Sequence, residues 1–249
     1  MIQNESATAR IAQAAAPGPA PRRKRRLRRH LLLAAAALVA LPVLVPLLLV
    51  PVYAVVDPIS TPMLQRYFTG RQVDRRWVPL ENVSDQLEAA VMMSEDGQFC
   101  RHHGVDVAAL RDEMRVWWEG GTPRGASTIT MQVARNLFLW NDRSVVRKAL
   151  EIPLALYIDL VLSKQRIMEI YLNIAQWGPA GEFGIEAGAR SAFGVGAGDL
   201  GWQRAALMAA SLPNPLVRRP ESPGPQMRRV ARVVEERARK SGPYTACLG

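Results

Sequence analysis

The stretch Ser94–Asp106 reads SEDGQFCRHHGVD and gathers two adjacent acids, two adjacent histidines, a cysteine and a third acid. It follows a run in which Leu87, Val91 and Glu95 fall on one face at helical spacing. Glu95 therefore ends an apolar helix face, where partial desolvation raises the pKa of a carboxyl group and makes it a better proton acceptor near neutral pH. Taken alone, the stretch is compatible with a polar loop after a helix, an acid/base site or a metal site.

The two histidines argue against the metal site. His102 and His103 are adjacent, so their side chains should point in different directions, whereas metal-ligand pairs on helices prefer i, i+4 spacing. Asp96 lies beside Glu95, and two neighbouring acids push each other's titration apart. Asp96 can also hold a hydrogen-bonded turn. These residues leave both the polar loop and the acid/base site open.

A second polar stretch, RGASTITMQVARN, leads into another predicted helix. Residues 125–128 are expected to open that helix, with Ser127 and Thr128 at its start. Backbone N–H groups and the dipole at such a terminus attract anions such as phosphate. Gln132 and Arg135 follow one or two turns along. An ordinary capped helix is the alternative interpretation.

A third stretch, RSVVRKALE at residues 143–151, combines cations and an acid. Arg147 and Lys148 precede Glu151 by four and three residues, which places all three side chains on one helix face. A solvated ion-pair face is the plain alternative, but the helix continues as IPLALYIDLVL, which is too apolar for open water. An acid among cations in such a helix suits a site that handles a charged leaving group. Pro153 should kink this helix.

The net charge of +10 is concentrated at the start of the chain of 249 residues. Residues 1–30 carry a net charge of +7, which leaves +3 for the rest and argues against a folded nucleic-acid-binding surface. Residues 31–56 contain no charged side chain, and about 20 apolar residues suffice to span a bilayer as a helix. Because Lys/Arg excess stays cytoplasmic, we expect a basic cytoplasmic tail over 1–30, a transmembrane anchor over 31–56 and an exported domain over 57–249. A cleaved signal peptide is the alternative.

The exported part is predicted to be one compact, mainly α-helical domain. Several runs show helical spacing of apolar residues, and no stretch shows convincing alternation with period 2 between turn residues. Residues 57–80 are expected to form a mixed polar linker before the first helix. Candidate helix caps are Ser84 or Asp85, Ser144 and Ser163.

Other patterns carry little information. Cys100 and Cys247 are far apart and form no disulfide framework or zinc spacing, so they are interpreted as incidental thiols. Gly196, Gly198 and Gly201 spell GxGxxG, but a dinucleotide site requires a strand before the glycines and none is predicted there. No GxxxxGK[ST] occurs, so nothing favours the use of a nucleoside triphosphate.

These three stretches, together with a fourth at residues 164–173, resemble motifs of the peptidoglycan glycosyltransferase family. The motif EDxxFxxHxGxD is matched by Glu95, Asp96, Phe99, His102, Gly104 and Asp106. The motif GxSTITxQ is matched by Gly125, Ser127, Thr128, Ile129, Thr130 and Gln132. The motif RKxxE is matched by Arg147, Lys148 and Glu151, and KxxIxExYLN by Lys164, Ile167, Glu169, Tyr171, Leu172 and Asn173. The motifs keep the family's order over about residues 57–215.

The resemblance implies a lysozyme-like, mainly helical domain that polymerises lipid II and releases undecaprenyl pyrophosphate. It implies Glu95 as the general base and Glu151 as a second catalytic residue that orients the cations or coordinates the donor. The residues it assigns to substrate binding are Asp96, Ser127, Thr128, Gln132, Arg135, Arg143, Arg147, Lys148 and Asn173. A divalent cation such as Mg²⁺ is an expected aid at the diphosphate, although no ligand set is visible in the sequence.

The implied partners are lipid II, the lipid-linked growing glycan, the bacterial inner membrane and other cell-wall synthesis proteins. The SxxK and KTG motifs of penicillin-binding transpeptidase domains do not occur, which favours the monofunctional branch of the family. Two alternatives stay open. A lysozyme-like hydrolase would share the fold and one catalytic acid without the clustered cations, and a non-catalytic cell-wall scaffold would need none of the acids.

Overall fold

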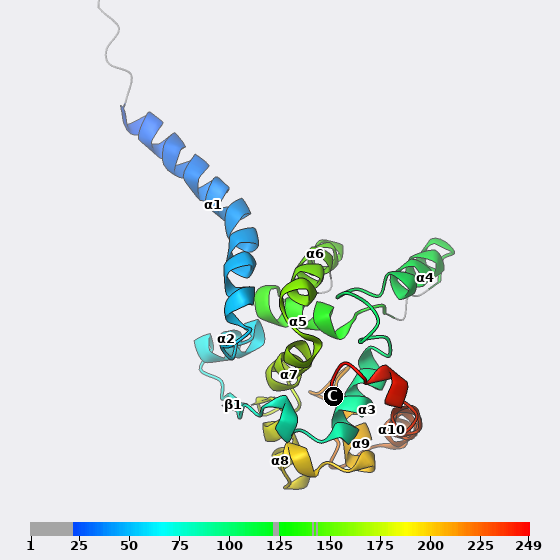
Figure 1. The fold of residues 1–249 in the computed structure, drawn as a ribbon. Helices are drawn as coiled ribbons and strands as arrows, with labels where there is room; N and C mark the ends of the chain where they lie inside the picture. Colours follow the sequence, from blue (N-terminus) through cyan, green and yellow to red (C-terminus); the bar gives the residue numbers. More distant parts are fainter. Residues whose placement is uncertain (1–21, 122–124, 141, 143) are drawn as a thin grey trace, which may run out of the picture. The chain divides into compact units, whose positions relative to one another are not determined.

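The structure is a computed structural model, and it describes residues 22–121, 125–140, 142 and 144–249. The chain divides into two units, Met1–Leu44 and Val45–Gly249. Helix α1 (Arg22–Val52) crosses this boundary and covers most of the predicted 31–56 segment (Figure 1). A search of the described residues finds no helix that is both long enough and apolar enough to cross a membrane.

The second unit is mainly helical, as predicted. Its elements are, in chain order, α2 (Thr61–Phe68), β1 (Asp74–Arg75), η1 (Leu80–Asn82), α3 (Asp85–Glu95), α4 (Val107–Trp118), α5 (Ile129–Phe138), α6 (Val145–Val161), α7 (Lys164–Ile174), β2 (Glu182–Phe183), α8 (Ile185–Phe193), η2 (Ala197–Asp199), α9 (Trp202–Ser211), α10 (Pro225–Ala238) and η3 (Gly242–Tyr244). The two strands pair in parallel, Asp74 with Glu182 and Arg75 with Phe183. They are too short to give a period-2 pattern. Residues 57–80 are more structured than the predicted linker, because they contain α2 and β1.

Helices α2, α3, α5, α6 and α7 begin where a side-chain oxygen accepts a backbone N–H group. Ser84 accepts from Leu87 at 3.3 Å, and the predicted caps Ser144 and Ser163 act in the same way on α6 and α7. Helix α5 begins at Ile129, four residues later than predicted, because Thr128 is its cap. Helix α6 continues through Pro153 to Val161.

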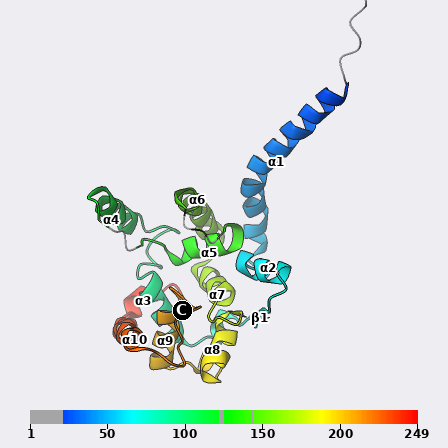
Figure 2. The ribbon, with the colours of Figure 1, turned by 180° about the vertical axis from the view of Figure 1, so that it is seen from behind.

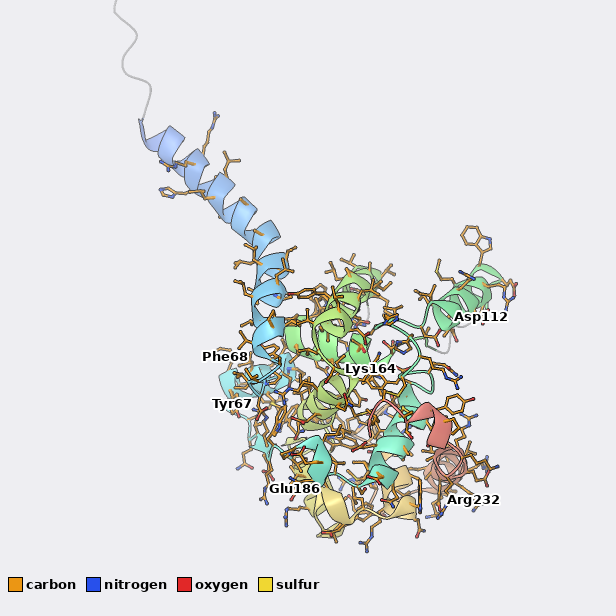
Figure 3. All side chains as sticks on the ribbon, viewed as in Figure 1. Tyr67, Phe68, Asp112, Lys164, Glu186 and Arg232 are labelled. Carbon is orange, nitrogen blue, oxygen red and sulfur yellow. A yellow bond between two sulfur atoms is a disulfide. The ribbon has the colours of Figure 1, made fainter. Side chains whose placement is uncertain are left out.

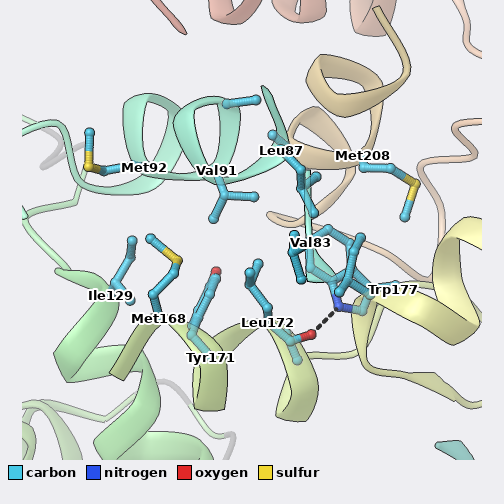
Figure 4. Close-up of a cluster of buried hydrophobic side chains, with 14 of the residues drawn as sticks. Val83, Leu87, Val91, Met92, Ile129, Met168, Tyr171, Leu172, Trp177 and Met208 are labelled. Atoms are coloured by element: carbon cyan, nitrogen blue, oxygen red, sulfur yellow. Dashed lines mark hydrogen bonds between the residues drawn. The ribbon is translucent and has the colours of Figure 1, made fainter. Parts of the chain in front are cut away.

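One apolar core holds α3, α7 and α9 together. Figure 4 shows its centre, which is formed by Leu87, Val91 and Met92 of α3, Met168, Tyr171 and Leu172 of α7, Met208 of α9 and Trp177. The Trp177 indole donates to the carbonyl oxygen of Leu172 at 3.1 Å. In the views of Figures 1 and 2, α5 lies against α6 and α7, and α3 lies against α9 and α10. This packing fixes the end of α3 that carries Glu95.

The two cysteines are joined. Cys100 and Cys247 form a disulfide with an S–S distance of 2.02 Å across 147 residues of sequence. The interpretation as incidental thiols is therefore wrong. Two cysteines give no spacing pattern, so only the fold could bring them together. The bond attaches the C-terminal segment to the loop that follows Glu95.

Candidate active site

Glu95 lies at the end of α3, half-buried, as the apolar spacing predicted. Its Oε2 accepts a hydrogen bond from the Gln132 side-chain amide at 2.9 Å. Burial raises the pKa of Glu95, and the Gln132 bond together with Arg135 and Arg218 opposes part of that rise. No ion pair of Glu95 is found among the described residues. A carboxylate held by a neutral donor in a partly desolvated place is suited to accept a proton.

Gln132 is itself oriented by two neighbours. The Tyr171 hydroxyl donates to Gln132 Oε1 at 3.3 Å, and Arg135 donates to the same oxygen at 3.4 Å. Burial raises the pKa of Tyr171 well above its ordinary value, so its hydroxyl stays protonated and remains a donor. Because both donors occupy Oε1, the Gln132 amide N–H groups are directed to Glu95. Helices α5 and α7 thus position the side chain of Glu95 on α3.

Asp96 connects the first motif to the start of α5. Its carboxylate accepts from the His102 ring at 2.9 Å and from the backbone N–H of Ile129 at 3.0 Å. The two histidines diverge as predicted, because the His102 side chain is buried whereas that of His103 is fully exposed. Asp96 is buried, and its carboxylate bonds to groups inside the protein, which is the arrangement of a residue that positions others.

The start of α5 differs from the predicted anion site. The N–H of Ile129 bonds to Asp96, and the N–H of Met131 bonds to the Thr128 hydroxyl at 3.1 Å. Thr128 also donates to the carbonyl oxygen of Gly104 at 2.6 Å. These N–H groups already have carboxylate and hydroxyl partners, so they are not free for a phosphate group. Gly104 has φ +80° and approaches α6 closely, because a Cβ there would lie 2.4 Å from the carbonyl oxygen of Ala155.

The third motif forms the predicted ion cluster on α6. Glu151 is 1% exposed, and Arg147 pairs with its Oε1. Lys148 Nζ lies 3.1 Å from Glu151 Oε2 and 2.6 Å from the Ser127 hydroxyl. Burial lowers the pKa of Lys148, and Glu151 opposes that effect. Two cations and one carboxylate leave an excess of positive charge, and Lys148 is the member with a partly exposed side chain.

Arg135 connects Glu95 to the ion cluster on α6. Its charge stabilises ionised Glu95 and destabilises charged Lys148, so it is electrostatically coupled to both. Arg135 and Gln132 also line a cleft of about 410 Å³ together with Tyr171 and the segment 212–216. Gln132, which donates to Glu95, and Arg135 therefore line the same cleft.

Sequence reasoning missed two members of this site. Arg218 influences the titration of Glu95 and donates to the carbonyl oxygen of Ala210 at 2.7 Å. Tyr171 was identified only as part of the KxxIxExYLN match, without a role in the site. A cation directly after LPNPLV, behind the last apolar helix, was the available clue to Arg218.

Two of the residues predicted to bind substrate are not part of the site described above. Asn173 is fully buried, and its amide exchanges hydrogen bonds with both backbone groups of Val78 at 2.8 Å, which indicates a structural role. Arg143 lies outside the described residues. Among the residues that the structure does describe, no group of three or more His, Cys, Asp or Glu side chains could hold a metal ion.

Comparison with known proteins identifies the family of this chain. Residues 61–239 match the family model described as Transglycosylase. A protein of Rhodopseudomonas palustris (strain TIE-1) named biosynthetic peptidoglycan transglycosylase is 53% identical over 211 residues, covering 85% of this chain and 88% of that protein. Proteins of the same name from Agrobacterium fabrum and Brucella suis are each 52% identical, covering 82% and 84% of this chain and 91% and 96% of theirs. The predicted resemblance is confirmed, and the chain belongs to the transglycosylase family.

Proposed function

We propose that the chain polymerises lipid II into glycan strands of the bacterial cell wall and releases undecaprenyl pyrophosphate. Family membership and the names of the relatives support peptidoglycan glycosyl transfer as the activity. The observation that carries the mechanism is the position of Glu95, held by the neutral Gln132 amide beside Arg135. The lipid substrate and the role of each residue are inferences from this arrangement.

Glu95 acts as the general base. It removes the proton from the 4-hydroxyl of a lipid II sugar while that oxygen attacks C1 of the growing glycan. The C1–oxygen bond to the pyrophosphate breaks, its electron pair leaves with undecaprenyl pyrophosphate, and the proton ends on Glu95. The raised pKa of Glu95 favours this transfer, since a general base works best when its pKa approaches the working pH.

The cations of α5 and α6 stabilise the leaving group. Negative charge develops on the pyrophosphate oxygens in the transition state, and fixed cations aimed at those oxygens lower its energy. Lys148 and Arg135 are the available charges, while Arg147 and Glu151 hold Lys148 in place. A divalent cation such as Mg²⁺ would supply further positive charge at the diphosphate, but these steps use only the chain's own residues.

A lysozyme-like hydrolase is the competing function. It would use a carboxylic acid such as Glu95 but would not need the Arg147–Lys148–Glu151 cluster. Incubation of the purified full chain with lipid II separates these activities. We expect glycan polymer and undecaprenyl pyrophosphate as products, and cleavage of existing glycan without polymer would contradict the proposal.

We place residues 1–30 in the cytoplasm, an anchor at 31–56 and the catalytic domain outside the inner membrane. The uncharged 31–56 segment beside a basic run supports this topology. The Cys100–Cys247 disulfide supports an oxidising compartment for the domain. Exposed apolar side chains on α4 and α6, such as Trp118 and Leu160, support contact of the domain with lipid. A periplasm-active reporter after Gly249 should work, and one at Arg26 should not. The reverse pattern would contradict the orientation.

A further inference from the structure

A second cleft lies away from the site around Glu95, at the beginning of α3. It has a volume of about 660 Å³ and is lined by the start of α3, by α7, by the end of α10 and by the C-terminal segment from Ser241. The Cys100–Cys247 disulfide attaches that segment to the body of the domain, so this wall of the cleft is covalently fixed. We call this cleft the α3 cleft.

Glu88 lines the α3 cleft, and its carboxylate has no partner among the residues that the structure describes. The residue is only 9% exposed, yet no hydrogen bond or ion pair reaches its carboxylate among the described residues. Buried carboxylates are normally paired, because removal from water costs free energy that a partner must offset. Burial and the nearby Asp85 raise the pKa of Glu88 to about 7. A buried, unpaired acid that faces a cleft is the arrangement expected when a ligand supplies the missing partner.

The charged groups around Glu88 leave the cleft negative. Asp85 and Glu81 also line it, and both are exposed without an ion pair among the described residues. Glu169 of α7 is neutralised by Arg166 and accepts from Trp77 and Leu80.

The one cation of the lining, Arg239 of α10, does not neutralise these acids. It pairs with Glu235 at 2.7 Å and lies over the Trp202 ring at 4.9 Å. Three carboxylates, those of Glu81, Asp85 and Glu88, are thus left without a counter-charge in the described lining. A cationic ligand is therefore favoured and an anion is excluded.

The lack of a convergent ligand group among the described residues bears on the kind of cation. A metal ion needs oxygen ligands that converge within about 2.6 Å, and no group of three His, Cys, Asp or Glu side chains among the described residues could provide this. Ammonium groups spread along a chain instead match acids spread along a cleft. Apolar side chains, including Val83, Ala89 and Leu248, also line the cleft and suit methylene groups.

We propose that the α3 cleft binds a short linear polyamine, with one ammonium group on Glu88 and the next on Asp85 and Glu81. The site is separate from the proposed polymerisation chemistry, since none of these acids belongs to the cluster around Glu95. A protonated amine keeps its charge up to about pH 10, whereas Glu88 must lose its proton to bind it. Affinity should therefore rise roughly tenfold between pH 6 and pH 8, following the ionised fraction of a group with a pKa of about 7.

The test is calorimetric titration of the purified full chain with spermidine at low ionic strength. We expect saturable binding to one site and at least tenfold weaker binding to E88Q. Glutamine has the size of glutamate and lacks the buried charge, so this variant should fold. D85N, at an exposed position, should also weaken binding. The matched control is E236Q, which removes an exposed acid of α10 outside the cleft and should bind spermidine as the unaltered protein does.

Three results would overturn the proposal. The first is no saturable binding of spermidine up to millimolar concentration. The second is equal affinity in E88Q, and the third is an equal loss in E236Q, which would indicate attraction by net charge alone. Titration with Mg²⁺ serves as a further comparison, and Mg²⁺ binding that E88Q abolishes while spermidine fails to bind would also contradict the polyamine assignment.

Discussion

Glu95 and Glu151 are both acids in the transglycosylase motifs, but their surroundings differ. Glu95 is half-buried and receives one hydrogen bond from a neutral amide. Glu151 is almost fully buried and has a cation on each of its oxygens, Arg147 on one and Lys148 on the other. A carboxylate with free lone pairs and a raised pKa can take up a proton, whereas the Glu151 carboxylate has both of its oxygens paired with cations. We therefore propose proton transfer for Glu95 and the positioning of cations for Glu151.

The difference also explains why two helices are needed. Helix α3 presents Glu95 from an apolar face, and its neighbour Asp96 anchors the following loop to α5. Helix α6 places its acid between cations one turn away, where it can keep Lys148 extended toward Ser127. Proton acceptance and charge stabilisation are thus built from different local sequences and meet through Arg135.

Removal of the base should give the largest effect. E95Q keeps the size of the side chain and loses the proton acceptor, so polymerisation of lipid II should fall by about 10²–10⁴. Circular dichroism should be unchanged. The control E236Q should retain normal activity. Activity of E95Q within tenfold of the unaltered protein would remove Glu95 from its role.

Removing Lys148 or Glu151 from the ion cluster on α6 should give the next largest effect on the polymerisation rate. K148A deletes a cation near the pyrophosphate and E151Q deletes the group that holds it, so each should lose on the order of 10²–10³ in rate. E151Q also leaves the buried Arg147 without its counter-charge and should melt at a lower temperature. The exposed Lys240 provides the control K240A. If K148A is as active as K240A, the cluster has no catalytic part.

Arg218 should tune Glu95 and leave Glu151 unaffected. The raised pKa of Glu95 keeps it protonated to higher pH than an ordinary glutamate, so the rate should fall on the acid side at a pH above about 4.3. Arg218 opposes that rise, and R218A should therefore move the acid limb to still higher pH, with a loss of a few-fold near that limb. The exposed neighbour gives the control R219A. If the acid limb of the pH–rate profile lies at the same pH in R218A as in the unaltered protein, Arg218 does not act on Glu95.

Removing the Cys100–Cys247 disulfide should have the smallest effect on the polymerisation rate but a clear effect on the melting temperature. It anchors the loop after Glu95 and not the helix of Glu151. A bond of this span typically contributes about 2–4 kcal/mol, so the double variant C100S/C247S should melt several degrees lower. Polymerisation at 25 °C should stay within about twofold. Reductant should lower the melting temperature of the unaltered protein alone, and an equal shift in C100S/C247S would count against the bond.

Local patterns predicted much of this molecule. Serine caps and apolar spacing located most helices, and the one-turn separation of Arg147, Lys148 and Glu151 predicted their cluster, because these features depend on neighbours in sequence. The Cys100–Cys247 bond, the approach of Arg218 and the capture of the α5 start by Asp96 depend on long-range packing. The N–H of Ile129 at the start of α5, where a phosphate site was predicted, bonds to Asp96 for the same reason, since that carboxylate comes from another motif.

We infer that Glu151 and Lys148 act as one functional unit and that Glu95 acts separately from them. A double-mutant cycle with lipid II tests it, using the rates of the unaltered protein, K148A, E151Q and K148A/E151Q below their melting temperatures. Groups that act as a unit give strongly non-additive losses. We predict that the double variant is little slower than the slower single variant. Losses that multiply in full would contradict the account, because Glu151 would then act independently of the cation it contacts.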